Sequence, residues 1–597
     1  MTRQKAPRPA IHYRITPTDP AAHLFEIELR IDRPDPDGQC LTMPAWIPGS
    51  YMIRDFARHI VRIEASSGDQ TVFLQKVDKQ TWQAEPCAGR LLVRYQVYAW
   101  DLSVRGAHLD QTHGFFNGTS VFLAVAGQTE APVSVDIARP AAADLRDWRV
   151  ATTLPAAGAK VWGFGKYQAA NYDELIDHPV EMGRFRTVGF KAGGAQHEIV
   201  VTGADQVDMD RLARDLQPIC RAQARLFDPA KGRAPIDRYL FLTMAVGQGY
   251  GGLEHRASTA LICRRDDLPY PGMTEQTEGY RTFLGLASHE YFHTWNVKRI
   301  KPAVFSPYQL DQESYTSLLW VFEGFTSYYD DLMLVRTGTI SAADYLVQLG
   351  RTTTRIAQGP GAALQSIAES SFDAWTRFYR QDENAPNVIV SYYAKGALVA
   401  LALDLTIRLK SKHRHSLDDV MRLLWDRYGR NFSTDGQGLP EDVMPDLIRE
   451  ATGVNVAREI RAWAYGTEPL PLARLLGKFG VRLQMQADAG KNRWLGWRLA
   501  DDRGQCSVTH VLSESPAHQA GVSAGDVLVA LDGLRIDSEK TLLSLLARRP
   551  VGQPATLHVF RADVLMSFSI NAQTPPADTA NLTLEKPRLA RFLNAEQ

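Results

Sequence analysis

Two histidines separated by three residues form the part of the sequence best suited to chemistry. They begin and end the run HEYFH at residues 289–293. In a helix, residues four apart lie on the same face, so His289 and His293 can bind one metal ion, and this spacing is typical of zinc. Glu290 would lie beside the ion without binding it and could accept a proton from a metal-bound water. The pattern predicts a catalytic zinc site with Glu290 as general base.

A third ligand is expected further along the chain. Glu323 follows the apolar residues 318–322, which predict the buried face of a second helix. A carboxylate among such neighbours is costly to bury unless a cation compensates it. Two histidines and one glutamate leave the fourth position of zinc open for water, which is the catalytic arrangement. We therefore expect one zinc ion per chain, bound by His289, His293 and Glu323, in preference to a pair of structural histidines.

Upstream of the histidines, a pair of glycines and a glutamate follow a predicted strand at residues 239–244. Gly251 and Gly252 lack side chains, so a substrate peptide could approach their backbone closely. Glu254 could then bind the free α-ammonium group of that substrate, which would make the enzyme an exopeptidase acting at the amino terminus. Two glycines in a loop also serve ordinary turns, and this alternative stays open for the loop taken alone.

The order of these motifs resembles that of the gluzincin aminopeptidases. Their signatures are a GxMEN-type loop, HExxH, a downstream EGF glutamate and YxKG. This chain has GGLEH from residue 251, HEYFH from 289, EGF from 323 and YAKG from 393. More narrowly, the chain resembles the glycyl aminopeptidase family in HTWNVKRI at 293–300, in WIPGSY at 46–51 and in a carboxyl-terminal PDZ domain. The resemblance spans most of the chain.

The resemblance implies a role for each matching residue. It assigns zinc binding to His289, His293 and Glu323, the general base to Glu290, and the substrate amine to Glu254. It also implies that Tyr393 donates a hydrogen bond to the oxyanion of the tetrahedral intermediate, a role that suits a neutral donor. Tyr392 is adjacent, and a tyrosine in such an apolar run can equally serve core packing.

Two cations follow the second histidine. Lys298 and Arg299 could bind a substrate carbonyl or carboxylate, or could complement the negative end of a helix dipole or form a structural pair. We favour the dipole or structural pair, because basic residues are common in a last helical turn.

Composition limits the class of protein. The 597 residues are 45% hydrophobic and 22% charged, as in ordinary globular proteins, and Lys plus Arg equal Asp plus Glu at 67 each. No general field favours nucleic acid or an anionic membrane as a partner. The first nine residues are basic without an apolar stretch after them, and the apolar run 397–403 is too short to span a bilayer. Five scattered cysteines suggest reduced thiols, so we expect a cytoplasmic protein.

The chain is long enough for several domains, and we expect a multidomain α+β protein. Alternating strands such as 24–31 predict a β-sandwich-like domain over residues 1–180. The motifs lie in a mostly helical, thermolysin-like catalytic domain at 181–470. Residues 494–499 and 515–533 resemble a PDZ domain, assigned to 471–577, and 578–597 are expected to form a loosely held tail. The PDZ domain could bind a peptide ligand in its groove or only brace the catalytic domain.

These observations predict a zinc-dependent aminopeptidase that acts on peptides with a free amino terminus. The preference for small first residues, Gly or Ala, comes from the family resemblance alone. One alternative is a zinc endopeptidase in which Glu254 contacts a backbone amide of the substrate. Another is a PDZ scaffold whose zinc site is vestigial.

Overall fold

Two compact units divide the chain. The first comprises residues 1–314 and 421–440, and the second comprises 315–420 and 441–597. The computed structural model describes residues 9–490, 492–502, 504–587 and 591–593. The division falls inside the expected catalytic domain, so that domain contributes to both units. No helix among these residues is long and apolar enough to cross a membrane.

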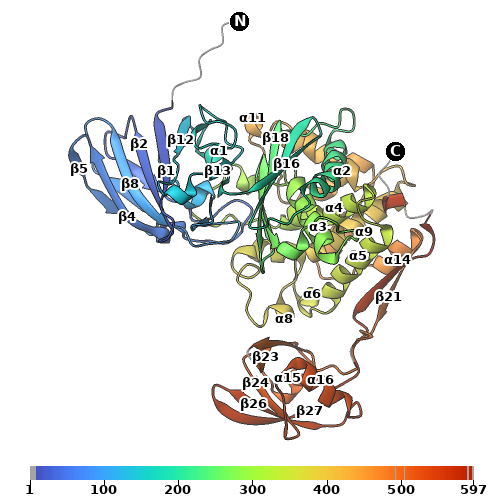
Figure 1. Ribbon diagram of the computed structural model, residues 1–597. Helices are drawn as coiled ribbons and strands as arrows, with labels where there is room; N and C mark the ends of the chain where they lie inside the picture. The colour runs from blue at the N-terminus through green and yellow to red at the C-terminus, as the bar shows by residue number, and fades with distance from the viewer. Residues whose placement is uncertain (1–8, 491, 503, 588–590, 594–597) are drawn as a thin grey trace. The chain divides into compact units, whose positions relative to one another are not determined.

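Three sheets form the amino-terminal part of the first unit, where buried and exposed residues alternate along the strands. The largest sheet is mostly antiparallel, with β1 and β12 parallel (Figure 1). Its order is β14 (Gly165–Ala169), β12 (Val133–Ile137), β1 (Ile11–Asp19), β2 (Leu24–Ile31), β8 (Leu91–Tyr98), β4 (Ile60–Ser67) and β5 (Gln70–Val72). The strand order of the second sheet is β13 (Arg149–Ala151), β15 (Val180–Gly183), β10 (His113–Phe116) and β9 (Ala107–Leu109). The strand order of the third sheet is β11 (Ala124–Val125), β3 (Cys40–Thr42), β7 (Thr81–Ala84) and β6 (Leu74–Lys76). The predicted β-rich domain is confirmed.

A five-stranded sheet follows and carries the helix with the two histidines. Its order is β16 (Arg186–Ala192), β17 (Ala195–Thr202), β18 (Arg238–Val246), β20 (Ser258–Arg264) and β19 (Gly251–Glu254). Strands β17, β18 and β20 are parallel, and β18 is a nearly continuous buried run, as expected for a sheet covered on both faces. Helix α2 (Met209–Phe227) packs against β16, and α3 (Glu278–Phe292) packs against β19 and α2. The short strand β19 therefore forms the edge of this sheet beside α3.

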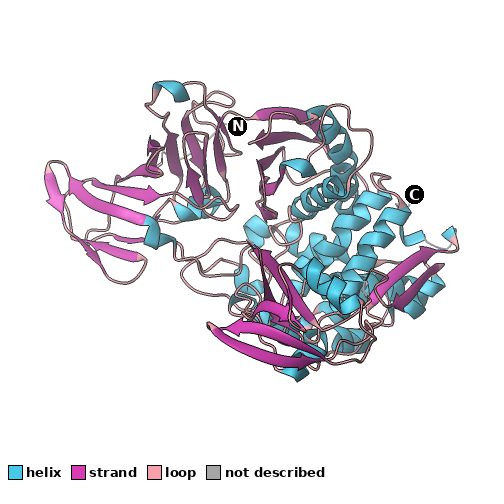
Figure 2. Cartoon of the chain, turned by 60° about the horizontal axis from the view of Figure 1, so that its bottom comes forward, coloured by secondary structure: helices cyan, strands magenta, loops and turns pink. Residues whose placement is uncertain are grey.

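Helices, cyan in Figure 2, make up most of the second unit before its carboxyl-terminal strands. A π-helical turn, η6 (Trp320–Gly324), leads directly into α4 (Phe325–Arg336), which packs with α5 (Ala342–Ala357) and α9 (Ala394–Lys410). Helix α9 is buried over nearly its whole length. The predicted combination of a sheet-rich amino-terminal part and a mostly helical central part is confirmed.

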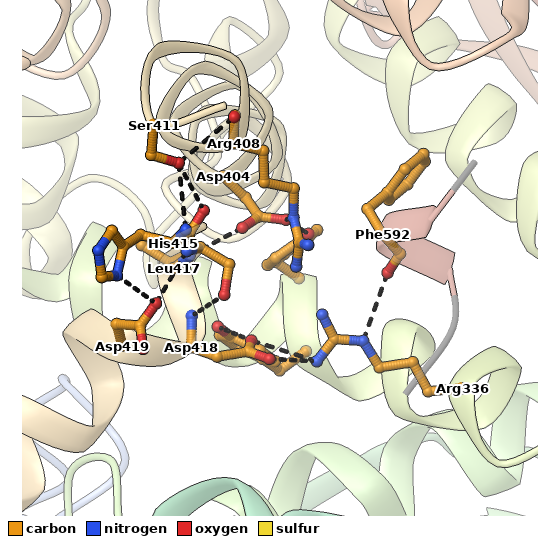
Figure 3. A network of polar contacts seen from close by, with 12 residues as sticks. Arg336, Asp404, Arg408, Ser411, His415, Leu417, Asp418, Asp419 and Phe592 are labelled. Carbon is orange, nitrogen blue, oxygen red and sulfur yellow. Dashed lines mark hydrogen bonds and ion pairs between the residues drawn. The ribbon is translucent and has the colours of Figure 1, made fainter. Parts of the chain in front are cut away.

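Buried charges pair within α9, and between α4 and α10 (Leu417–Leu424), as Figure 3 shows. Arg408 lies 3.0 Å from Asp404 on α9, and Arg336 lies 2.9 Å from Asp418 at the start of α10. Arg336 also donates a hydrogen bond to the carbonyl oxygen of Phe592 at 3.4 Å. Each buried charge has an opposite charge beside it, which is the condition under which burial is tolerated.

The PDZ fold lies between two strands that pair with each other. Strand β21 (Val481–Gln486) is antiparallel to β28 (Thr579–Leu584), and β28 packs against α5. The PDZ sheet runs β22 (Trp497–Asp502), β23 (Gln505–Val511), β24 (Val527–Leu531), β26 (Ala555–Arg561), β27 (Val564–Ile570), with β25 (Leu534–Arg535) beside β24, and helices α15 (Pro516–Ala520) and α16 (Glu539–Ala547).

The expectation of a loosely held tail after residue 577 is wrong for two of its segments. Residues 579–584 complete the two-stranded ladder with β21, and Phe592 and Leu593 are buried. The ring of Phe592 packs edge-on against Phe479, with centroids 5.7 Å apart. Backbone pairing and aromatic burial hold this segment, and neither gives a local sequence signal when the partner lies about a hundred residues away.

Candidate metal and catalytic site

Helix α3 directs the two histidines at one point. The Nε2 atoms of His289 and His293 lie 3.0 Å apart. The Nδ1 atom of His293 lies 2.7 Å from the carbonyl oxygen of Asn296 and must donate to it, so Nε2 is the nitrogen whose lone pair can bind a metal ion. Two nitrogens bound to one tetrahedral zinc ion at about 2.0–2.1 Å each lie roughly 3.3 Å apart. The pair therefore fits a shared metal ion.

Three buried hydrogen bonds position α3. The Tyr291 hydroxyl lies 3.0 Å from Nε2 of His197 on β17, and the Tyr239 hydroxyl on β18 donates to the carbonyl oxygen of Glu290 at 3.4 Å. Gln223 on α2 donates to the carbonyl oxygen of Ser288 at 2.9 Å. Burial lowers the pKa of His197 to about 4, so its ring is neutral near pH 7 and can accept from Tyr291. These bonds tie both sides of the helix to the sheet and to α2.

Strand β19 runs directly against the predicted general base. A Cβ added to Gly252 would lie 2.0 Å from Oε1 of the buried Glu290. No side chain larger than hydrogen fits there unless Glu290 moves. The neighbouring Gly251 differs, because the nearest atoms to an added Cβ lie 3.7 Å away. Gly252 thus allows the carboxylate of Glu290 to lie beside the edge of the sheet.

A second glycine makes a similar contact with Glu254. Gly49 has a left-handed backbone with φ of +98°, and its added Cβ would lie 2.5 Å from both carboxylate oxygens of the buried Glu254. Glu254, Glu290 and His293 each offer a ligand atom, and these atoms lie within 4.8 Å of one another. The first unit therefore brings these three predicted site residues together. Sequence reasoning assigned no role to Gly49, although the WIPGSY motif marked its position.

The second unit holds the other two predicted residues. Glu323 is buried on the π-helical turn η6, a feature often found at functional sites. An added Cβ on Gly324 would lie 2.7 Å from Cα of Gly396, so η6 and α9 approach at their backbones. Tyr393 immediately precedes α9. Within this unit, the EGF and YAKG motifs thus meet at their glycines.

The two adjacent tyrosines differ in their surroundings. Tyr392 is fully buried against Phe378, with ring centroids 4.7 Å apart. Tyr393 is partly exposed, and its hydroxyl lies 3.0 Å from that of Tyr379. Tyr392 therefore has the environment of a packing residue, whereas Tyr393 is less buried and has its hydroxyl beside that of Tyr379. No motif in the sequence marked Tyr379 as a neighbour of this hydroxyl.

The two cations after α3 have structural partners. Lys298 is buried, and its ammonium group lies 2.7 Å from Oδ1 of Asp177. Burial alone would raise the pKa of Asp177, but Lys298 and Arg256 lower it well below its usual range. Arg299 donates to the carbonyl oxygens of Thr294 at 2.7 Å and Arg256 at 3.0 Å. These contacts support the structural pair and leave no need for a role in substrate binding.

Models of three known domain families match successive parts of the chain. The Peptidase M61 N-terminal domain model matches residues 12–184, the M61 glycyl aminopeptidase model matches 282–399 and the PDZ domain model matches 477–572. The crystal structure of an aminopeptidase N family protein from Idiomarina loihiensis is 41% identical, covers 98% of this chain and 100% of its own, and has a TM-score of 0.93. The M1 zinc metallopeptidase of Deinococcus radiodurans is 12% identical over 78% of this chain and 96% of its own, with a TM-score of 0.48. No curated protein matches the chain.

The contact between Gly252 and Glu290 predicts a specific loss of turnover. In Gly252→Ala, the new methyl group displaces the carboxylate of Glu290, and a shift of about 1 Å in a catalytic group can cost about 100-fold. We expect kcat for glycyl-p-nitroanilide to fall by about that factor with metal content unchanged. Gly251→Ala is the matched control, because its methyl group meets only ordinary contacts. Equal kcat values for the two variants would contradict the role given to this contact.

Proposed function

The chain belongs to the M61 glycyl aminopeptidase family, and on that premise we propose that it is a zinc-dependent aminopeptidase that removes small first residues, Gly or Ala, from peptides. The observation that carries the proposal is the group of Glu254, Glu290 and His293 around one point of the first unit. One carboxylate of this group suffices as general base, so the second is available for the positively charged end of a substrate.

We propose that one zinc ion per chain is held by His289, His293 and Glu323. The 3.0 Å separation of the imidazole nitrogens and the orientation of His293 by the Asn296 carbonyl support the two histidines. Burial of Glu323 on the π-helical turn η6 supports the third ligand, because such turns are often found at functional sites. When bound, zinc lowers the pKa of a water molecule and polarises the scissile carbonyl.

In the proposed mechanism, the residues of the chain divide the remaining tasks. Glu290 accepts the proton of the attacking water and later delivers it to the leaving amine. Tyr393 donates a hydrogen bond to the oxyanion, a role supported by the partial exposure of this residue. Glu254 binds the α-ammonium group and thereby sets the distance from the amino terminus to the cleaved bond.

The edge strand β19 supports a binding mode for the substrate. It pairs with β20 on one side and lies at the end of the five-stranded sheet. We propose that the substrate backbone lies along Gly251 and Gly252 as an added strand, since a peptide can extend a sheet at such an edge. This would lead the first residue of the substrate toward Glu254 at the end of β19.

We also propose a domain organisation and a location. The domains are a β-rich domain at 1–180, a catalytic domain at 181–470, a PDZ domain at 471–577 and a carboxyl-terminal segment at 578–597. A peptide ligand of the PDZ domain would add to β22, which lies at the edge of its sheet. All five cysteines are free thiols, which supports a cytoplasmic location.

Replacing the general base tests the proposed chemistry. In Glu290→Gln, the amide cannot accept a proton, and we expect kcat to fall by about 100- to 10,000-fold while the metal stays bound. Elemental analysis and hydrolysis of glycyl-p-nitroanilide check both parts. Glu278→Gln, at the exposed start of the same helix, serves as the control. Loss of metal in Glu290→Gln, or retained turnover, would rule out the assigned role.

Acetylation of the substrate tests the recognition of a free amine. We expect glycyl- and alanyl-p-nitroanilide to be cleaved and their N-acetylated forms to resist cleavage. Glu254→Gln should lower kcat/KM for the free-amine substrates by about 10- to 100-fold, the value of a charged hydrogen bond, and leave the acetylated forms unaffected. Equal cleavage of both forms by the unaltered chain would favour an endopeptidase, and no cleavage of either would favour a scaffold.

A further inference from the structure

Four side chains able to bind a metal lie on one face of the sheet formed by β13, β15, β10 and β9, and the catalytic proposal uses none of them. Phe115 on β10 pairs with His108 on β9 and with Glu181 on β15. Because side chains alternate between the faces of a sheet, His113 shares the face of Phe115, and Asp110 shares that of His108. The face therefore carries His108, Asp110, His113 and Glu181 together.

The distances within this group suit a single ion. Nε2 of His108 lies 3.3 Å from Oδ2 of Asp110, which is hydrogen-bond distance and is also close to the roughly 3.3 Å that separates two ligands of one tetrahedral zinc ion. Ligand atoms of His108, Asp110 and His113 all lie within 4.8 Å of one another. The three ligand atoms are therefore close enough to be candidates for one ion, and their separation would have to shorten on binding.

Burial leaves His113 with an unsatisfied nitrogen. The residue is 2% exposed, and its Nε2 atom is buried with no hydrogen-bond partner among the residues that the structure describes. Its Nδ1 atom lies 3.2 Å from Oε1 of Glu181, which also accepts a hydrogen bond from Thr202 at 2.9 Å. A metal-bound histidine commonly directs its second nitrogen at a carboxylate in this way, and the first nitrogen is then free to bind.

The space beside these residues is small and partly apolar. His108, His113 and Glu181 line a cavity of about 20 Å³ together with Leu242 of β18 and Leu261 of β20. A volume of at least about 10–15 Å³ is needed for one water molecule, so the cavity has room for one small ion or one water. It lies where the amino-terminal sheets meet the five-stranded sheet within the first unit.

A purely structural alternative explains less of this arrangement. His113 could be a cation paired with Glu181, and His108 could pack between Trp100 and His113, with ring centroids 4.9 and 4.8 Å away. Within the described part of the chain, that arrangement leaves Nε2 of His113 and Nδ1 of His108 buried without a hydrogen-bond partner. Buried polar groups are rarely left in that state.

We propose that His108, Asp110 and His113 bind a second divalent transition-metal ion, with Glu181 orienting His113. Two imidazoles and a carboxylate suit zinc and similar ions better than calcium or magnesium, which prefer oxygen ligands. The ion would cross-link β9 and β10, and Glu181 would connect His113 to Thr202 on β17 of the five-stranded sheet, which would stabilise the first unit. This inference does not rest on the proposed function.

Zinc stoichiometry in a chain without the catalytic histidines tests the second site. The background variant His289→Gln/His293→Gln of the full chain, stripped and titrated with Zn²⁺, should bind one ion by calorimetry and elemental analysis. Adding His113→Gln should abolish that binding. Adding His23→Gln instead is the matched control, and this variant should still bind one ion. His23 contacts the ring of Trp100, in the same group of aromatic residues, but does not belong to the ligand set. A background that binds no zinc, or one in which His113→Gln still binds it, would overturn the proposal.

Two further measurements guard against misfolding. Asp110 is less buried than the two histidines, and Asp110→Asn keeps the shape of its side chain. In the same background, this change should weaken Zn²⁺ binding at least tenfold and leave the circular dichroism spectrum unchanged. Co²⁺ added to the background variant should quench the fluorescence of Trp100, because Trp100 stacks on His108. The quenched component should be absent when Trp100→Phe is added to that variant. Unchanged affinity in Asp110→Asn, or no Trp100-dependent quenching, would contradict the site.

Discussion

The absence of a side chain at Gly252 is the constraint on which the candidate site of the first unit depends. The backbone of β19 can lie against the Glu290 carboxylate only because no Cβ occupies the intervening space. This contact brings the edge of the five-stranded sheet to α3 at Glu290, the residue that follows His289. Gly49 has the same effect on Glu254, from a loop of the amino-terminal part. Close backbone approach thus places two carboxylates beside the histidines without additional polar residues.

The second unit uses the same principle with helices. Gly324 and Gly396 allow η6 and α9 to meet at their backbones, which places Glu323 and Tyr393 on neighbouring segments. Further along α9, Asp404 accepts a hydrogen bond from the Tyr328 hydroxyl of α4 at 2.8 Å. The helix is therefore held near its start by glycine contact and along its length by buried polar pairs. These contacts at two places along α9 would help to keep Tyr393, the residue directly before the helix, in one orientation.

Local spacing allowed part of the site to be predicted, and non-local contacts account for the rest. The four-residue spacing of His289 and His293 follows from helix geometry, and the structure has both Nε2 atoms at one point. The partner of Lys298 could not be predicted, because Asp177 lies more than a hundred residues upstream and no pattern links them. The same holds for His197, which positions α3 through Tyr291. The strand-rich and helix-rich parts followed from periodicity, whereas the pairing of β21 with β28 around the PDZ fold gave no local signal.

The proposed chemistry depends on the binding of one zinc ion by His289, His293 and Glu323. X-ray data collected just above and just below the zinc absorption edge, from crystals of the full chain grown with Zn²⁺, test this ligand set. We expect an anomalous peak bound by Nε2 of both histidines and by the Glu323 carboxylate, with Glu254 and Glu290 outside the ligand set. A peak whose carboxylate ligand is Glu254 would rule out the proposed ligands, because Glu254 could then not bind the substrate amine.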